Sequence, residues 1–107
     1  MIYYNVTIKI AMEAEENWLK WMQNQHIPDV LATNLFTSAK LCRILSLDTS
    51  DGVTYSIQYA CTSMQDVHLY QSHFAQKLQK EHNDKFKDQF VAFRSVMEQV
   101  HVVDDQS

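Results

Sequence analysis

The sequence predicts a single α+β domain with the element order β-α-β-β-α-β. Four segments alternate apolar and polar residues with the period of a half-buried strand, and two longer segments repeat apolar residues at helical spacing. The only glycine, Gly52, lies in a turn-forming run between two of the strand segments. With 107 residues, 46% of them hydrophobic, the chain is long enough for one core and too short for two domains.

The first strand is expected at 3–10, where every second residue is apolar. A helix is expected to follow over 13–25, because acidic residues at its start favour the positive end of the helix dipole. Leu19, Met22 and His26 fall on one face of this helix.

Pro28, the only proline of the chain, predicts a break after this helix. It should push Ile27 into an extended conformation, and it suits the first turn of a short second helix over Pro28–Thr33. The break would leave His26 and Asp29 close together at a bend in the backbone.

A hairpin is expected in the middle of the chain. Asn34 is expected to adopt a left-handed conformation and end the short helix. The second strand is expected over Ala39–Leu47 and the third over Val53–Cys61, joined by the turn-forming run Asp48–Gly52.

A long second helix is expected after Ser63, because Ser63 and Asp66 form a capping-box pattern. The fourth strand is expected over Phe90–Val100. The domain should therefore cover residues 1–101, with a frayed tail at 102–107.

Under right-handed crossovers, this order gives a four-stranded antiparallel sheet with two helices on one face, the ferredoxin-like arrangement. The strands carry apolar or aromatic residues on both sides, for example Tyr3 with Tyr4 and Ile44 with Leu45. An open sheet face that is apolar usually meets a partner. We therefore expect a homodimer through the open sheet face, in the form of a dimeric α+β barrel.

Seven short motifs follow one another along the chain: Trp18–Trp21, His26–Leu31, Leu41–Leu45, Asp51–Tyr55, Gln58–Tyr59, Glu81–His82 and Phe90–Arg94. In this order they resemble the short bacterial domain-of-unknown-function family numbered 4286, over nearly the whole chain. The resemblance implies the dimeric α+β-barrel type of fold, and it implies no activity. Asn34 stands where the family pattern would have glycine.

The composition disfavours several classes of function. A formal net charge of −4 and a pI of about 5.6 argue against nucleic acid or an anionic membrane as a partner. No stretch approaches about 18 consecutive apolar residues and no basic leader is present, so we expect a cytoplasmic protein. The two cysteines, Cys42 and Cys61, show no metal-binding spacing, and neither a metal nor a cofactor is expected.

His26 and Asp29 are the candidate catalytic residues, since an imidazole held by a carboxylate keeps a defined tautomer and can act as a general base. The alternative is structural, with the histidine near the last carbonyls of one helix and the aspartate near the first N–H groups of the next. His82 follows Glu81 in the second helix. Because the two helices run antiparallel, His82 is expected at the opposite end of the molecule from His26, too far away to share a metal.

Arg43 and Arg94 each interrupt an apolar strand face, where an arginine needs a carboxylate, a ligand or solvent. Their strands are expected at opposite edges of the sheet, so the two arginines could meet across a dimer and bind an anion. The alternative is a structural salt bridge to Glu98, Asp29 or Glu81.

Together these residues predict a pocket between helices and sheet that binds a small organic or anionic ligand. Its expected ligand-binding residues are Trp18, Trp21, His26, Asp29, Arg43, Tyr55, Tyr70 and Arg94; the aromatic members are alternatively core residues. Two other functions stay open. One is a cofactor-independent enzyme of the oxygenase, isomerase or cyclase type, as in similar dimeric barrels, and the other is a purely structural dimerisation module.

Overall fold

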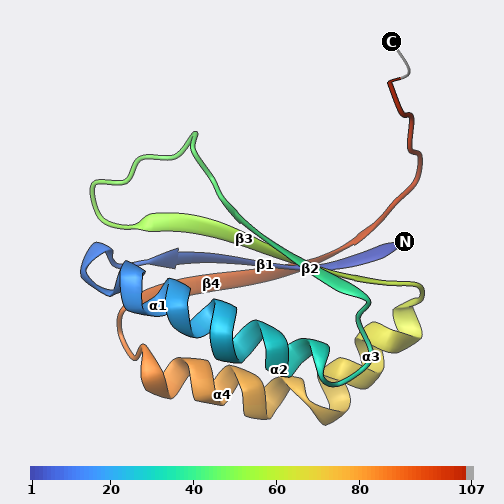
Figure 1. Ribbon diagram of the computed structural model, residues 1–107, viewed down its shortest axis with the longest axis horizontal. Helices are drawn as coiled ribbons and strands as arrows, with labels where there is room; N and C mark the ends of the chain where they lie inside the picture. Colours follow the sequence, from blue (N-terminus) through green and yellow to red (C-terminus); the bar gives the residue numbers. More distant parts are fainter. Residues whose placement is uncertain (106–107) are drawn as a thin grey trace.

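The computed structural model describes residues 1–105 and contains one four-stranded antiparallel sheet with helices on one face (Figure 1). The strand order is β2-β3-β1-β4, which confirms the predicted ferredoxin-like α+β fold. In chain order the elements are β1 (Ile2–Ile10), a 3₁₀ turn (Met12–Ala14), α1 (Glu15–Trp21), a π-helical turn (Met22–His26), α2 (Ile27–Leu31), β2 (Ser38–Arg43), β3 (Val53–Cys61), α3 (Met64–His73), α4 (Ala75–Lys85) and β4 (Phe90–Glu98).

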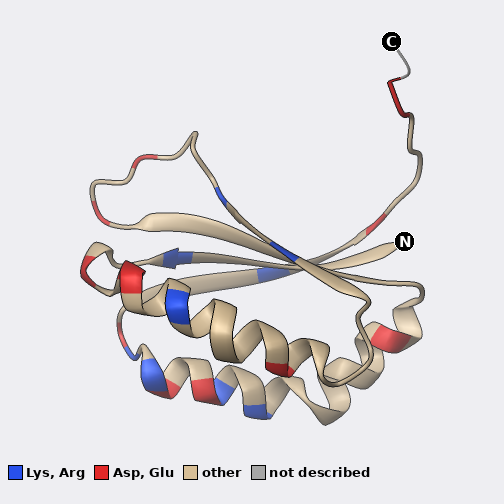
Figure 2. Ribbon diagram, in the orientation of Figure 1, with Lys and Arg blue, Asp and Glu red and all other residues tan. Residues whose placement is uncertain are grey.

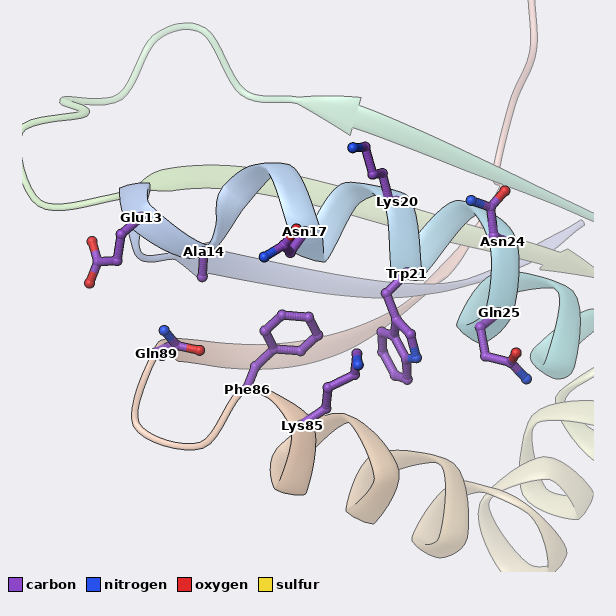
Figure 3. A pocket seen from close by; sticks show the side chains of 10 residues that line it. All are labelled: Glu13, Ala14, Asn17, Lys20, Trp21, Asn24, Gln25, Lys85, Phe86 and Gln89. Carbon is purple, nitrogen blue, oxygen red and sulfur yellow. The ribbon is translucent and has the colours of Figure 1, made fainter.

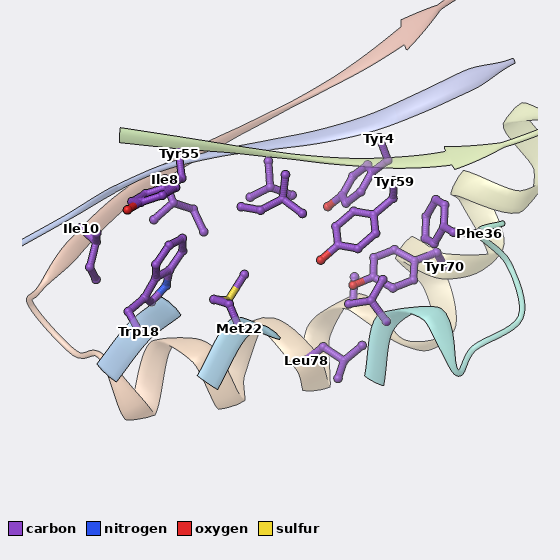
Figure 4. Packing of buried hydrophobic residues seen from close by; sticks show 14 of the residues in the cluster. Tyr4, Ile8, Ile10, Trp18, Met22, Phe36, Tyr55, Tyr59, Tyr70 and Leu78 are labelled. Carbon is purple, nitrogen blue, oxygen red and sulfur yellow. The ribbon is translucent and has the colours of Figure 1, made fainter. Parts of the chain in front are cut away.

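The core lies between the sheet and the helices. β1 is a central strand that pairs with both β3 and β4. Its side chains alternate between the two faces, so Tyr4, Ile8 and Ile10 point toward the helices and are buried. Trp18 and Met22 pack onto this face from the first helical segment (Figure 4).

Charged residues lie mainly on α1, α4 and the loops, and basic residues also lie on β1, β2 and β4 (Figure 2). Two ion pairs with helical spacing, Glu16 with Lys20 and Lys80 with Asp84, lie on the solvent side of these helices. Within residues 1–105, no helix is long and apolar enough to cross a membrane.

The expected break at Pro28 is wrong, because the chain stays helical from residue 12 to residue 31. Ile27 has φ −62° and ψ −45°, which is helical and not extended. The Ile27 N–H donates to the Met22 carbonyl five residues earlier, as in a π-helix. A proline ring clashes with the carbonyl four residues earlier in a regular α-helix, and the wider π-helical turn relieves that clash.

The helix after this turn ends at Leu31, slightly before the expected Thr33. Asn34 has φ 65°, the left-handed conformation that the sequence predicts for it. Asn tolerates this conformation better than most residues do, so it can end the helix where glycine would be the usual choice.

The expectation of one long second helix is also wrong. α3 and α4 are separated at Phe74, whose φ of −129° and ψ of −33° are not helical. No proline or glycine lies nearby, and nothing in the local sequence marks this break. The Ser63 hydroxyl reaches the Asp66 side chain at 3.4 Å and caps no backbone N–H, so the expected capping box does not form.

The hairpin of β2 and β3 is confirmed, and β3 has the predicted bounds. β2 ends at Arg43, four residues earlier than expected. The last backbone hydrogen bond of the hairpin joins Ile44 to Thr54. Because β3 begins at Val53, residues 45–47 have no strand to pair with and form part of the loop.

Gly52 is required at the end of this loop. Its φ is +152°, and a Cβ atom at this position would lie 2.9 Å from the Ile10 carbonyl oxygen. Only glycine combines this conformation with so close an approach of the backbone.

β4 ends at Glu98, two residues before the expected end. Residues 99–105 form neither helix nor strand and extend away from the sheet (Figure 1). The predicted tail at 102–107 includes residues 106–107, which lie outside the described residues.

The sheet face opposite the helices is polar at its centre and apolar along β4. The Asn5 side chain donates to the hydroxyls of Thr7 and Ser95 and accepts from Ser56. Along β4, Val91 and Phe93 are 67% and 64% exposed on this face.

Candidate functional site

A small polar cavity lies inside the core, between the sheet and the helices. Its volume is about 20 Å³, which is room for about one water molecule. Apolar side chains from β1, β3 and the first helical segment form part of its wall. The polar residues that line it are Tyr4, His26, Tyr59, Tyr70, Gln79, His82 and Arg94.

Two histidines from facing helices meet beside this cavity. The ring centroids of His26 and His82 are 5.8 Å apart, so the expectation that they lie at opposite ends of the molecule is wrong. The error follows from Pro28, because the helix continues past His26 and places it within a longer helical segment. α4 runs alongside this segment (Figure 1), and the His82 ring lies against the His26 ring.

The hydrogen bond of His82 defines its tautomer. The Trp18 indole N–H donates to His82 Nε2 over 2.9 Å. Indole nitrogen is only a donor, so Nε2 carries the lone pair and the proton of the neutral ring resides on Nδ1. Burial lowers the pKa of His82 to about 4, and the charges of His26 and Arg94 add to this effect.

His26 has an unsatisfied nitrogen. Its Nδ1 is buried and is the only buried side-chain nitrogen or oxygen within residues 1–105 that lacks a hydrogen-bond partner. Burial lowers the pKa of His26 to about 4; the Asp29 carboxylate opposes this shift and Arg94 adds to it. His26 is therefore a neutral imidazole near neutral pH, with an unused nitrogen beside the cavity.

Three tyrosines surround the cavity from the other side. Figure 4 shows the hydroxyl groups of Tyr4, Tyr59 and Tyr70 directed toward the same space between sheet and helices. Burial raises the pKa of each of these phenols, so all three stay protonated and can donate hydrogen bonds.

Arg94 and Gln79 connect the cavity to the surface. Both lie within hydrogen-bonding reach of the Tyr4 hydroxyl and lower the pKa that burial raises. Together with Tyr4 they also line an open groove of about 570 Å³ along α4 and β4. These three residues therefore stand where the outer groove and the inner cavity meet.

Arg43 belongs to a different cluster, at the opposite edge of the sheet from Arg94. The Tyr55 hydroxyl donates to Glu15 Oε2 over 2.5 Å and accepts from Arg43 Nε over 3.1 Å. Arg43 forms a salt bridge with Glu15, whose Oε2 lies 3.9 Å from Arg43 Nε. Glu15 is not one of the three partners that the sequence suggested, which were Glu98, Asp29 and Glu81. Burial, followed by the Glu15 hydrogen bond, raises the pKa of Tyr55. This network ties the start of α1 to the sheet.

Replacing Tyr55 by phenylalanine is expected to destabilise the protein by about 1–2 kcal/mol, because two charged side chains, Glu15 and Arg43, lose a hydrogen-bond partner at a partly buried position. Urea unfolding measures the change. Tyr3→Phe is the matched control, since the Tyr3 hydroxyl bonds Gln99 at an exposed site and its loss should cost about 0.5 kcal/mol or less. Equal effects of the two substitutions would contradict a structural role for the network.

Trp21 and Asp29 lie outside the cavity. Trp21 lines an open cleft of about 580 Å³ between α1 and the end of α4, opposite Phe86 (Figure 3). Its ring packs against His26 at 5.1 Å and His82 at 5.7 Å, and so separates this cleft from the histidine pair. The Asp29 carboxylate accepts a hydrogen bond from the Gln25 amide over 2.8 Å, so it influences His26 through its charge.

The structure therefore divides the predicted ligand-binding set. His26, Tyr70 and Arg94 line the cavity, and Trp18 lies behind His82. The other four predicted residues lie outside the cavity: Trp21, Asp29, Arg43 and Tyr55. The cavity residues that the sequence set lacks are Tyr4, Tyr59, Gln79 and His82. Strand alternation already pointed Tyr4 and Tyr59 inward, but a pattern does not distinguish a core tyrosine from one whose hydroxyl meets a cavity. Residues 1–105 contain no group of three or more acidic, histidine or cysteine residues placed to hold a metal ion.

Comparisons with known proteins bear on the fold. A family model described as "Domain of unknown function (DUF4286)" matches residues 1–100. No curated protein matches the chain.

Several solved structures share the architecture. An ethyl tert-butyl ether D (EthD) family protein from Bacillus halodurans is 12% identical, with a TM-score of 0.65 over 94% of this chain and 100% of its own. A dimeric ferredoxin-like protein from an uncultured marine organism is 14% identical, with a TM-score of 0.64 over 98% and 100%. A candidate antibiotic biosynthesis monooxygenase from Deinococcus radiodurans is 10% identical, with a TM-score of 0.62 over 100% of both chains. At sequence identities this low, the similarity to these structures shows only that the fold is shared.

Proposed function

The chain belongs to the DUF4286 family, and from that premise we propose that it binds a small organic anion at the meeting point of the inner cavity and the outer groove. The observation that carries the proposal is the buried, unpartnered Nδ1 of His26 beside a cavity that Arg94 also lines. Buried polar atoms are rarely left without a partner, so each one that is calls for an explanation such as a bound water, an ion or a ligand.

The chemistry of the lining favours a carboxylate or a similar group. Arg94 supplies a positive charge and a planar set of donors that matches a carboxylate. Gln79 and the tyrosine hydroxyls add neutral donors. The anionic head would displace about one water from the cavity, and the rest of the ligand would lie in the groove between α4 and β4.

Titration of ¹⁵N-labelled protein with acetate, pyruvate and benzoate tests the proposal. We expect backbone signals around His26, Gln79 and Arg94 to shift, and Arg94→Met to weaken binding by about tenfold, or ~1.4 kcal/mol. Arg43→Met is the matched control and should leave the affinity unchanged, because Arg43 lies at the other sheet edge. Absence of binding by all three carboxylates would instead favour the purely structural module.

The proposal includes a homodimer formed through the open sheet face. The exposed apolar side chains along β4 support it, as does the dimeric ferredoxin-like neighbour of the same fold. We expect Phe93→Lys to shift the protein from dimer to monomer in analytical ultracentrifugation. Leu45→Lys, a substitution at a loop position that is 83% exposed, should not. A wild-type monomer at micromolar concentration would refute this part of the proposal.

A cytoplasmic location also belongs to the proposal. Cys42 and Cys61 are free thiols and Cys42 is exposed, as is usual in a reducing compartment. The acidic composition continues to argue against a nucleic-acid partner.

A further inference from the structure

We propose that the C-terminal arm of each protomer, residues 100–104, crosses to the partner in the homodimer and lies along the free edge of its β2. The inference rests on the homodimer proposed above and adds to it a second contact, which the two copies exchange. It follows from the composition and direction of the arm, and from the charges at the edge that it reaches.

The arm has the composition of a β-strand, although residues 100–104 form neither helix nor strand. Its three valines, Val100, Val102 and Val103, are 89%, 56% and 77% exposed. Valine is typical of strands, whereas segments that stay disordered are mainly polar and charged. Contact with another surface would remove this apolar area from water, so the composition favours an arm that docks.

The base of the arm is anchored, and the arm points away from its own sheet. The Gln99 N–H donates to the Met1 carbonyl over 2.9 Å, and the Tyr3 hydroxyl donates to Gln99 Oε1 over 2.9 Å. From there the arm extends on the side of the sheet opposite the helices (Figure 1). The proposed partner packs on that same side, so the arm projects toward the partner.

The strand β2 offers a free edge. Within residues 1–105 it pairs with β3 alone, at one end of the strand order. Alternate backbone N–H and C=O groups of an edge strand point outward and can pair with an added strand. The arm follows β4, which forms the opposite edge of the sheet. The β2 strand that the arm reaches is therefore the partner's and not its own.

The charges at this edge complement those of the arm. Both charged residues of β2 are basic, Lys40 and Arg43, and the Lys40 side chain is exposed. The arm contains one acidic residue, Asp104, and no lysine or arginine. A lysine on an edge strand discourages indiscriminate pairing, and it favours an acidic segment over a basic one. The charges of Lys40 and Asp104 thus select the arm for this edge.

The dimensions of two packed sheets allow the exchange. A twofold axis parallel to the strands, between the facing sheets, places β4 of each protomer opposite β2 of the other. Met97, near the end of β4, lies in the same row across the sheet as Ser38, the first residue of β2. Facing sheets are about 10 Å apart, and five extended residues span about 17 Å. The first residues of the arm therefore cross the gap, and Asp104 arrives near the partner's Lys40.

Analytical ultracentrifugation of the full-length protein and of a variant that ends at Gln99 tests the proposal. We expect the dissociation constant of the dimer to rise about 100-fold without the arm, because its valines no longer bury apolar surface on the partner. The fold should be unchanged in circular dichroism, since the truncation removes no core residue.

A charge exchange tests where the arm docks. Lys40→Glu should raise the dissociation constant about fivefold. Adding Asp104→Lys to the same chain should restore the wild-type value, because opposite charges then meet again. Lys77→Glu, at an exposed position on α4, is the matched control and should leave the dissociation constant unchanged.

A truncated protein that keeps the wild-type dissociation constant would overturn the inference and leave the homodimer through the sheet face standing. Failure of Asp104→Lys to rescue Lys40→Glu would overturn the placement of the arm at β2. A wild-type protein that is monomeric at micromolar concentration would refute the homodimer, and this inference with it.

Discussion

Acidification from about pH 7.5 to about pH 5 is expected to lower the free energy of unfolding by about 4 kcal/mol, roughly 2 kcal/mol for each of His26 and His82. Folding lowers the pKa of both histidines from 6.5 to about 4. Their contribution is therefore complete above the unfolded-state pKa and is lost as the pH falls from about 6.5 toward about 4, because only the unfolded chain takes up the protons.

Urea unfolding at a series of pH values measures this loss. His26→Gln should remove about half of the pH dependence, and His73→Gln should leave it intact because His73 is exposed. The exposed carboxylates of Asp48 and Asp51 have lowered pKa values and titrate below this window. A stability that is flat between about pH 7.5 and about pH 5 would show that the histidines are not desolvated.

Trp18→Ala is expected to cost about 3–5 kcal/mol, a large part of the stability of a small domain. Trp18 is fully buried, packs on Tyr55 with ring centroids 5.0 Å apart, and supplies the hydrogen bond to His82. The substitution leaves a large cavity and an unsatisfied His82 Nε2.

Trp18→Phe separates these two contributions, since it keeps most of the volume and removes the N–H; we expect a loss of about 1–3 kcal/mol. Trp21→Phe is the matched control in urea unfolding. Trp21 is only partly buried and packs against the edge of the core. If Trp18→Phe is no more destabilising than Trp21→Phe, the Trp18–His82 bond does not support the core.

The sheet could be predicted from the sequence because strand alternation is a local signal. β3 has the predicted bounds, and β1 differs by one residue. The bounds of the helices are harder to predict, because they depend on local backbone conformation, which the spacing of apolar side chains does not reveal. Pro28 usually marks a helix boundary, yet here a π-helical turn absorbs it; the break at Phe74 has no local signal.

The helix break wrongly expected at Pro28 is the reason why only part of the site could be predicted from the sequence. His26 and Arg94 could be singled out because each places a polar group on an apolar face. A first helix that stops at residue 25 predicts His82 at the far end of the molecule, away from His26. Tyr4 and Tyr59 follow the core pattern of their strands, and only the position of their hydroxyls relates them to the cavity.

The most direct test of the account is a titration of protein carrying ¹⁵N-labelled histidine with pyruvate at about pH 7. We expect the imidazole signals of His26 to shift, while those of His68 and His73, on the exposed side of α3, do not. His82 should carry its proton on Nδ1 throughout the titration. An unchanged His26 spectrum at saturating pyruvate, or equal shifts in all of these histidines, would contradict a ligand site at the cavity.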